Sequence, residues 1–164
     1  MKTPFTYLAV FAFLSLSCSA GDDDDDNAQI AETYDNIEIP KNEKMIQQIK
    51  LTIGNKTLTA TLADNEATRV LVQKLSEKAI TIQSDDYGGF EKVGALGFSL
   101  PTSDERITTH SGDIMLYCGN QIVIFYGSNT WSYTPIGQIE YSSEDELKTF
   151  LNAGKGSVKV NLEL

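Results

Sequence analysis

The sequence predicts a mainly β protein, a closed barrel of about eight strands with two short helices. Segments in which apolar and polar residues alternate, as they do in half-buried strands, recur through residues 46–164. Two other segments change to helical spacing, and each begins with a residue that can cap a helix. The last segment, 158–164, alternates to the final residue, and we expect it to pair with the first strand. Such pairing would close the sheet and remove its exposed edges.

The first half of this domain is predicted to contain four strands and one helix. The strands are expected at residues 48–54, 58–63, 80–82 and 96–100. Gly54-Asn55 is typical of the turn of a hairpin, here between the first two strands. Asp64 is expected to cap a helix over 65–76, because the apolar residues that follow it recur on one face. The polar, glycine-bearing segment 84–92 is predicted to be a loop.

The second half is predicted to contain four further strands and a second helix. The strands are expected at residues 113–118, 121–126, 136–139 and 158–164. Gly119-Asn120 fits the two-residue turn between the first two of these. Ser143 and Glu146 match a capping box at the start of a helix that Gly154 is expected to end. Two polar segments are predicted to be exposed loops, 102–112 and 127–134.

The N-terminal segment 1–18 has the features of a secretory signal peptide. A basic start precedes an apolar stretch over 7–16, which is shorter than the roughly 20 residues of a membrane-spanning helix. The stretch ends in Leu14-Ser15-Leu16-Ser17-Cys18, which resembles the lipobox of bacterial lipoproteins. The resemblance implies that the Cys18 thiol carries a diacylglycerol that anchors the protein in a membrane. The alternative is a secreted protein from which Cys18 is removed.

Residues 19–45 are predicted to form a disordered, acidic tether between this anchor and the domain 46–164. They include five consecutive aspartates, Asp22–Asp26, and they hold much of the chain's formal net charge of −10. A run of like charges with few large apolar residues cannot bury enough surface to offset chain entropy. An acidic run just after the cysteine also resembles the surface-export signal of lipoproteins in some Gram-negative bacteria. We therefore expect a cell-envelope protein, anchored in the outer membrane and exposed at the cell surface.

Several kinds of partner and site are not expected. Arg69 and Arg106 are the arginines of the predicted domain, and they are not clustered as phosphate binding requires, so we expect no nucleic acid. The single histidine, His110, has no second histidine or cysteine cluster near it in the sequence, so we expect no metal site. No Gly-x-Ser-x-Gly motif supports a hydrolase. We expect no cofactor, and we expect a monomer.

Five motifs in order across about 49–151 resemble the small bacterial cyclophilin-like proteins. They are Leu62-Ala63-Asp64-Asn65-Glu66-Ala67, Asp86-Tyr87-Gly88-Gly89-Phe90-Glu91-Lys92, Ser111-Gly112-Asp113-Ile114, Ile122–Gly127 and Trp131-Ser132-Tyr133-Thr134-Pro135-Ile136-Gly137. The resemblance implies a cyclophilin-like β-barrel. True cyclophilins isomerise Xaa-Pro bonds, and they use an arginine to weaken an amide whose rotational barrier is about 20 kcal/mol.

The arginine-containing stretch of those enzymes is missing from this chain. Arg69 falls in the predicted helix and Arg106 in a polar loop, so we do not expect isomerase activity. Arg106 would be the electrophile if the protein were nevertheless a divergent prolyl isomerase. That activity is the main alternative to noncatalytic binding of a peptide or small ligand.

The candidate binding site consists of aromatic residues, most of them in predicted loops, and one acid. The six residues expected to bind a ligand are Tyr87, Phe90, Glu91, Tyr126, Trp131 and Tyr133. Aromatic side chains on loops offer a large contact area at a low entropy cost. The alternative is that these rings close the ends of the barrel. Trp131 and Tyr133 could also stack on a sugar ring, which would suit a glycan-binding accessory protein of the cell surface.

Two acidic residues of segment 84–92 could act as acid and base on a glycosidic bond. Asp85, Asp86 and Glu91 are the densest carboxylate group of the domain. Neighbouring side chains in a strand or turn point apart, so solvated charge is the favoured interpretation of Asp85 and Asp86. An ion pair with Lys92 or a place in the barrel wall is the alternative for Glu91.

Overall fold

The computed structural model describes residues 48–164. Three predicted features lie outside the described residues: the signal peptide 1–18 with its lipidation residue Cys18, the tether 19–45 and the domain start at 46. The described strands are β1 (Gln48–Ile53), β2 (Lys56–Leu62), β3 (Ile80–Tyr87), β4 (Glu91–Ala95), β5 (Glu105–Thr108), β6 (Asp113–Tyr117), β7 (Gln121–Phe125), β8 (Thr130–Ile139) and β9 (Val158–Glu163). The described helices are α1 (Glu66–Glu77) and α2 (Glu144–Phe150). No helix of the described part is both long enough and apolar enough to cross a membrane.

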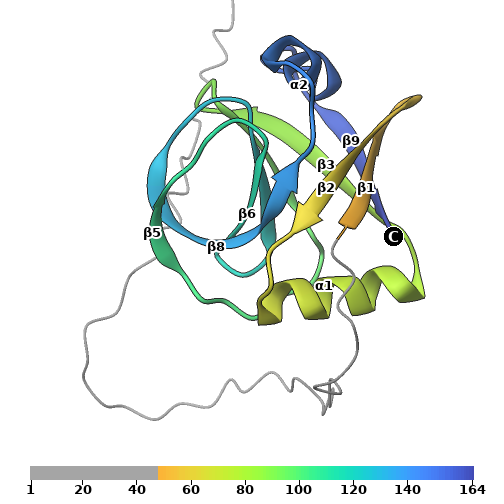
Figure 1. Ribbon diagram of the computed structural model, residues 1–164, viewed down its shortest axis with the longest axis vertical. Helices are drawn as coiled ribbons and strands as arrows, with labels where there is room; N and C mark the ends of the chain where they lie inside the picture. Colours follow the sequence, from red (N-terminus) through yellow and green to blue (C-terminus); the bar gives the residue numbers. More distant parts are fainter. Residues whose placement is uncertain (1–47) are drawn as a thin grey trace, which may run out of the picture. The chain divides into compact units, whose positions relative to one another are not determined.

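The strands of the described chain form a closed antiparallel barrel, which confirms the predicted fold class (Figure 1). The strand order is β2-β1-β9-β3-β4-β7-β6-β8, and pairing of β2 with β8 closes this ring. β5 lies outside the ring and pairs with the first part of β8. The last strand pairs with the first, with Leu162 opposite Leu51, as the sequence predicted. Closure of the ring leaves the eight barrel strands without a free edge.

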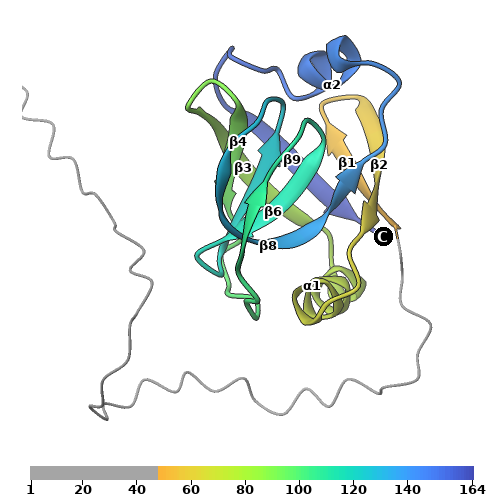
Figure 2. The ribbon, with the colours of Figure 1, turned by 60° about the vertical axis from the view of Figure 1, so that its left-hand side comes forward.

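The two helices lie at opposite ends of the barrel (Figures 1 and 2). Asn65 caps α1, whereas the sequence predicted Asp64. The Asn65 side chain accepts from the Thr68 backbone amide at 3.0 Å, and the Thr68 hydroxyl oxygen accepts from the Asn65 backbone amide. The side-chain Nδ2 of Asn65 also donates to Pro135 O on β8 at 2.7 Å, and this bond fixes the start of the helix to the barrel. Asp64 instead pairs with the exposed Arg69.

Helix α2 begins after Ser143, as predicted, but the capping box is incomplete. Ser143 Oγ accepts from the Glu146 amide at 3.2 Å, while the Glu146 carboxylate binds the amide and hydroxyl of Ser142 at 2.6 Å. The helix ends at Phe150, earlier than the predicted stop at Gly154, and Leu151 is its C-cap residue. The intervening residues form a turn in which Asn152 adopts a left-handed φ of 51°.

The secondary structure predicted for four segments differs from the one observed. The predicted loop 84–92 is mostly a hairpin, since β3 runs to Tyr87 and β4 begins at Glu91 around a tight turn at Gly88-Gly89. The predicted strand 96–100 is irregular because its amides bond to the β6–β7 turn instead of to a strand. The predicted loops 102–112 and 127–134 contain β5 and the start of β8.

Two apolar clusters lie on opposite faces of the sheet formed by β4, β7, β6 and β8. The larger one fills the barrel interior and includes Ile114, Leu116 and Ile124. We call the smaller one the outer cluster. Its members are Met115, Val123, Phe125 and Tyr133, with Phe90, Val93, Ile107 and Tyr117 packed against them. Strands β6 and β7 are therefore apolar on both faces, as strands covered on both sides are.

Candidate functional site

The outer cluster is a row of aromatic rings. Phe90 and Phe125 are stacked with centroids 6.4 Å apart and planes 4° from parallel. Phe125 meets Tyr133 edge to face at 5.6 Å, and Tyr133 meets Tyr117 at 6.1 Å. These separations and angles are those that aromatic pairs prefer. The strands β6, β7 and β8 and the turn before β4 thus bring together rings from four parts of the sequence.

Glu91 is a buried acid beside this row. As the first residue of β4 it lies between Tyr87 on β3 and Phe125 on β7 in the strand register. Only 5% of Glu91 is exposed, and its Oε2 atom has no hydrogen-bond partner in the described part of the chain. Burial raises the pKa of its carboxyl group to about 7. No ion pair within residues 48–164 involves Glu91, so no fixed positive charge offsets this burial.

Two exposed aromatic side chains border the outer cluster. Tyr87 is 66% exposed and Trp131 is 50% exposed. Trp131 shares a face of β8 with Tyr133, two residues along, and stands opposite Ile107 of the cluster in the β5–β8 pairing. Burial and the nearby Glu91 charge raise the pKa of Tyr133, with smaller contributions from Tyr117 and Tyr87. Phe125 connects Glu91 to Tyr133, since it pairs with Glu91 in the strand register and its ring meets that of Tyr133.

Tyr126 does not join the other predicted ligand-binding residues. Its side chain packs in the main core, and its hydroxyl donates to Asp86 Oδ1 at 2.9 Å. Burial and this bond to Asp86 raise the pKa of Tyr126 to about 12. Five of the six predicted residues, Tyr87, Phe90, Glu91, Trp131 and Tyr133, therefore lie at or beside the outer cluster.

Lys92, the neighbour of Glu91, points to the opposite face and belongs to a separate network. Its side chain is fully buried, and its Nζ lies 2.8 Å from Asp86 Oδ1. Lys92 also donates to Gly156 O at 2.5 Å, while the amides of Gly154 and Gly156 donate to Asp86 at 3.0 and 2.8 Å. Burial alone would raise the pKa of Asp86, but Lys92, these two amides and Tyr126 together lower it well below its usual range. This network joins the barrel to the segment after α2.

The predicted carboxylate group is therefore divided among three places. Asp85 bonds to Ser157, Asp86 to Lys92 and Glu91 to no described side chain. The hypothesis of an ion pair between Glu91 and Lys92 is wrong, because successive strand residues point to opposite faces. The same alternation places Asp86 on the opposite face of the barrel wall from Asp85 and Glu91.

Arg106 lies away from the aromatic row. It is exposed on β5 between Glu105 and Ile107, opposite Ser132 in the register. Since Ile107 packs against the outer cluster, strand alternation places the Arg106 side chain on the other face. Tyr133 is only 3% exposed, so its ring offers no free face to a sugar.

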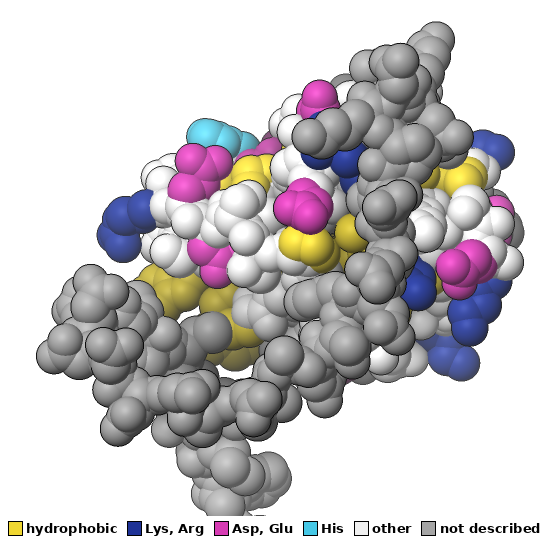
Figure 3. Space-filling view, turned by 90° about the horizontal axis from the view of Figure 1, so that it is seen from below, with side chains coloured by type: hydrophobic (Ala, Val, Ile, Leu, Met, Phe, Trp, Pro, Cys, Tyr) yellow, Lys and Arg dark blue, Asp and Glu magenta, His cyan; other side chains and the backbone are white. Residues whose placement is uncertain are grey.

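His110 is a surface residue. Its Nδ1 lies 3.9 Å from Asp113 Oδ2, and 78% of its side chain is exposed. The histidine, cyan in Figure 3, lies at the surface on a face that carries acidic, basic and uncharged side chains together. Within residues 48–164, no group of three or more metal-binding side chains is found.

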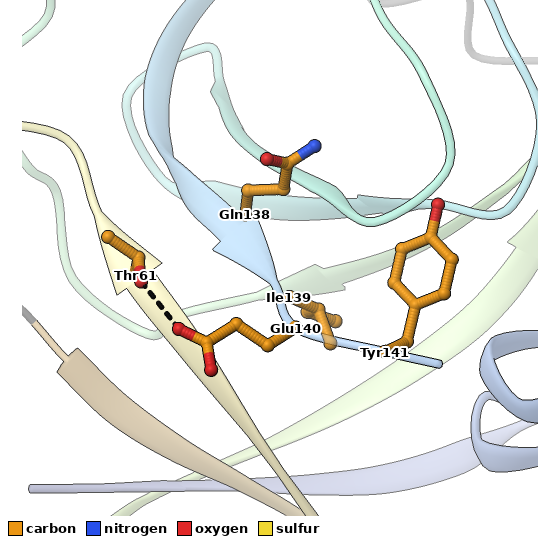
Figure 4. A pocket seen from close by; sticks show the side chains of 5 residues that line it. All are labelled: Thr61, Gln138, Ile139, Glu140 and Tyr141. Carbon is orange, nitrogen blue, oxygen red and sulfur yellow. Dashed lines mark hydrogen bonds between the residues drawn. The ribbon is translucent and has the colours of Figure 1, made fainter. Parts of the chain in front are cut away.

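A shallow pocket of about 360 Å³ lies elsewhere, where β2 meets the end of β8. Its lining consists of Thr61, Gln138, Ile139, Glu140 and Tyr141, none of which was predicted to bind a ligand (Figure 4). Glu140 Oε1 already accepts from Thr61 at 2.8 Å and from Gln48 at 3.0 Å. Because its acid is already hydrogen-bonded, this pocket is a weaker candidate than the surface around Glu91.

Six of the eight residues of the outer cluster were not among the predicted ligand-binding residues, namely Val93, Ile107, Met115, Tyr117, Val123 and Phe125. Met115, Tyr117 and Phe125 were assigned to the hairpin 113–126 without a role outside the barrel. The available signal was that both alternating sets of residues in this hairpin are apolar, which indicates a strand covered on both faces. Ile107 carried no comparable signal, because it is a single apolar residue in a polar segment.

The comparisons with known proteins agree with this architecture. The model of the Cyclophilin-like family matches residues 51–163, most of the chain, and the chain belongs to that family. The fold is similar to the solution structure of a hypothetical protein from Archaeoglobus fulgidus, with a TM-score of 0.53 and 14% identity. That match covers 71% of this chain and 93% of the archaeal one, and it supports the fold alone. None of the curated proteins compared with the chain matches it.

Proposed function

We propose that the domain binds a peptide or small ligand, without converting it, at the outer aromatic surface. We define this surface by the five residues Tyr87, Phe90, Glu91, Trp131 and Tyr133. The observation that carries the proposal is the buried Glu91 carboxyl group, of which one oxygen has no hydrogen-bond partner among residues 48–164. Leaving a buried polar group unsatisfied costs about 1–3 kcal/mol. Such costs are typical of functional sites, where a ligand supplies the missing partner.

The exposed rings at the border of the surface support binding. Large aromatic side chains are frequent anchors in interfaces, and Tyr87 and Trp131 are the most exposed large apolar residues of the described chain. The absence of a partner for Glu91 within residues 48–164 favours binding over catalysis, because acid and base chemistry needs a second positioned group. The position of Arg106 likewise gives no support to prolyl isomerisation at this surface.

Removal of the exposed rings is expected to weaken binding. We expect Tyr87→Ala and Trp131→Ala each to lower affinity about tenfold or more, as loss of an aromatic anchor does. Amide NMR shifts of the β4, β7 and β8 strands, followed during titration with a panel of short peptides and small aromatic compounds, measure the affinity. Leu164→Ala, which removes another exposed apolar side chain at the chain end, is the control. Equal affinities in all four proteins would rule out this surface.

We further propose that the protein is a lipoprotein of the bacterial cell envelope, anchored at the outer membrane through Cys18. The lipobox-like sequence that ends at Cys18 and the acidic run after it support this proposal. Mass spectrometry of the protein from a bacterial membrane fraction should find a diacylglycerol on an N-terminal Cys18, and Cys18→Ser should lack it. A secreted form that begins after Cys18, or a mature form with unmodified Cys18, would contradict the anchor.

A further inference from the structure

We propose that the ligand of the outer aromatic surface is an organic ammonium compound, which places a protonated amine at Glu91 and an apolar group against the neighbouring rings. This inference rests on the proposed function, since it names the chemical class of ligand for the same surface. It follows from three properties of the residues around Glu91: the unused acceptor, the local charge and the aromatic surroundings.

The first property is the acceptor. Glu91 Oε2 is buried without a hydrogen-bond donor, and a carboxylate accepts bonds through both of its oxygens. A ligand that offers N–H groups together with a positive charge would satisfy the oxygen and stabilise the ionised carboxylate. Charge-assisted bonds of this kind are roughly twice as strong as bonds between neutral groups. A ligand with its own carboxylate would instead be repelled.

The second property is the local charge. The titratable groups that the strand register and the ring contacts place on this side of the barrel wall are acids and phenols: Asp85 and Tyr87 on β3, Tyr133 on β8 with Glu105 opposite it on β5, and Tyr117, whose ring meets that of Tyr133. The basic neighbours in the sequence point elsewhere: Lys92 lies inside the barrel, and Arg106 lies on the other face of β5. The surface therefore attracts a cation, and among residues 48–164 no ion pair of Glu91 competes with it.

The third property is the aromatic surroundings. Phe90, Phe125 and Tyr133 lie around the acid, with the exposed rings of Tyr87 and Trp131 at the border. The faces of aromatic rings carry negative charge density and attract ammonium groups, by about 0.5–2 kcal/mol per contact. A carboxylate among several aromatic rings thus combines the two groups that recognise an organic cation. The exposed rings of Tyr87 and Trp131 provide contact area for its apolar part, since Phe125 and Tyr133 are buried.

The test compares three small probes that share a phenyl group and differ in charge: phenethylammonium, 2-phenylethanol and phenylacetate. The protein is the full chain with Cys18→Ser, which keeps it free of lipid. Amide NMR shifts in β4, β7 and β8 and the fluorescence of Trp131, the single tryptophan, report binding. We expect phenethylammonium to bind at least tenfold more tightly than 2-phenylethanol and phenylacetate to bind least.

Glu91→Gln is the matched variant, since it keeps the shape of the side chain and removes its charge. We expect it to lower the affinity for phenethylammonium to about that for 2-phenylethanol. If the variant does not fold, the pH dependence of binding to the parent chain tests the inference instead. The affinity for phenethylammonium should rise at least tenfold between pH 5.5 and pH 8.5, as Glu91 ionises, and the affinity for 2-phenylethanol should change less.

The outcomes separate this inference from the proposed function. If all three probes bind at this surface with equal affinity, or if Glu91→Gln keeps the preference for the ammonium, the ligand class is wrong and the binding function stands. If no probe shifts the resonances of this surface, the proposed binding function is wrong, and the proposed ligand class is then wrong too.

Discussion

Replacing Lys92 with methionine is expected to destabilise the fold by about 3 kcal/mol, the largest effect we predict for one side chain. Breaking a buried ion pair by removing one partner typically costs about 3–5 kcal/mol, because the other charge is left uncompensated. We expect the lower end of this range, since Asp86 keeps its bonds from two backbone amides and Tyr126, and 21% of its side chain is exposed. Urea unfolding measures the change.

The control for this variant is Lys159→Met, because Lys159 is an exposed lysine on β9 and has no ion pair within the described chain. We expect its free energy of unfolding to stay within about 0.5 kcal/mol of the parent value. The same network predicts a loss of stability in acid. Since the folded pKa of Asp86 lies below its ordinary value of 3.8, its contribution is complete above that pH and is lost as the pH falls below it. A loss below 1 kcal/mol in Lys92→Met would show that the network does not hold the segment after α2.

Replacing Glu91 with glutamine is expected to have the opposite effect and to stabilise the fold at alkaline pH. The folded protein holds the Glu91 proton up to about pH 7, whereas the unfolded chain releases it near 4.5. The folded state binds more protons between these values, so stability falls as the pH rises from about 4.5 to 7. The full shift corresponds to about 3 kcal/mol. Because solvent near the surface screens part of it, we expect about 1–2 kcal/mol.

Urea unfolding of Glu91→Gln and the parent protein at pH 4 and pH 8 measures this effect. At pH 4 the carboxyl group is mostly protonated in both the folded and the unfolded state. We therefore expect the variant and the parent to differ less in free energy of unfolding at pH 4 than at pH 8. At pH 8 the variant should be more stable by about 1–2 kcal/mol. Paired with weaker ammonium binding, this gain would identify Glu91 as a residue kept for function at the expense of stability. A variant that is equally destabilised at both pH values would mean that Glu91 has a structural role instead.

The barrel could be predicted from the sequence because its determinants are local. The hairpins around Gly54-Asn55 and Gly119-Asn120, the two helices and the final strand all follow from apolar periods and turn residues. The errors lie where tertiary contacts outweigh local preference. The polar end of β3 is a strand because Asp85 and Asp86 find partners in the segment after α2. That segment is about 70 residues away in the chain, so no local pattern indicates the pairing.

The candidate site could be predicted only in part. The aromatic residues and Glu91 were chosen by residue type, and the strand register then separated Tyr126 from the rest. Register decides the face of each side chain, and a shift of one residue reverses every face. The sequence alone did not fix the register of 84–92, so it could not show that Glu91 and Lys92 point to opposite sides of the barrel wall. The apolar residues on both faces of the hairpin 113–126 indicated a second cluster, but nothing in the sequence placed Glu91 beside it.

The most direct test of the account is the pKa of Glu91, measured by carbon-13 NMR of its side-chain carboxyl group with and without phenethylammonium. The resonance is assigned from its absence in Glu91→Gln. We predict a pKa of about 7 in the free protein, and a clearly lower value when phenethylammonium is bound, since the cation stabilises the ionised form. An ordinary pKa near 4.5 in the free protein, or a raised pKa that the cation leaves unchanged, would contradict the assignment of Glu91 as the centre of the binding surface.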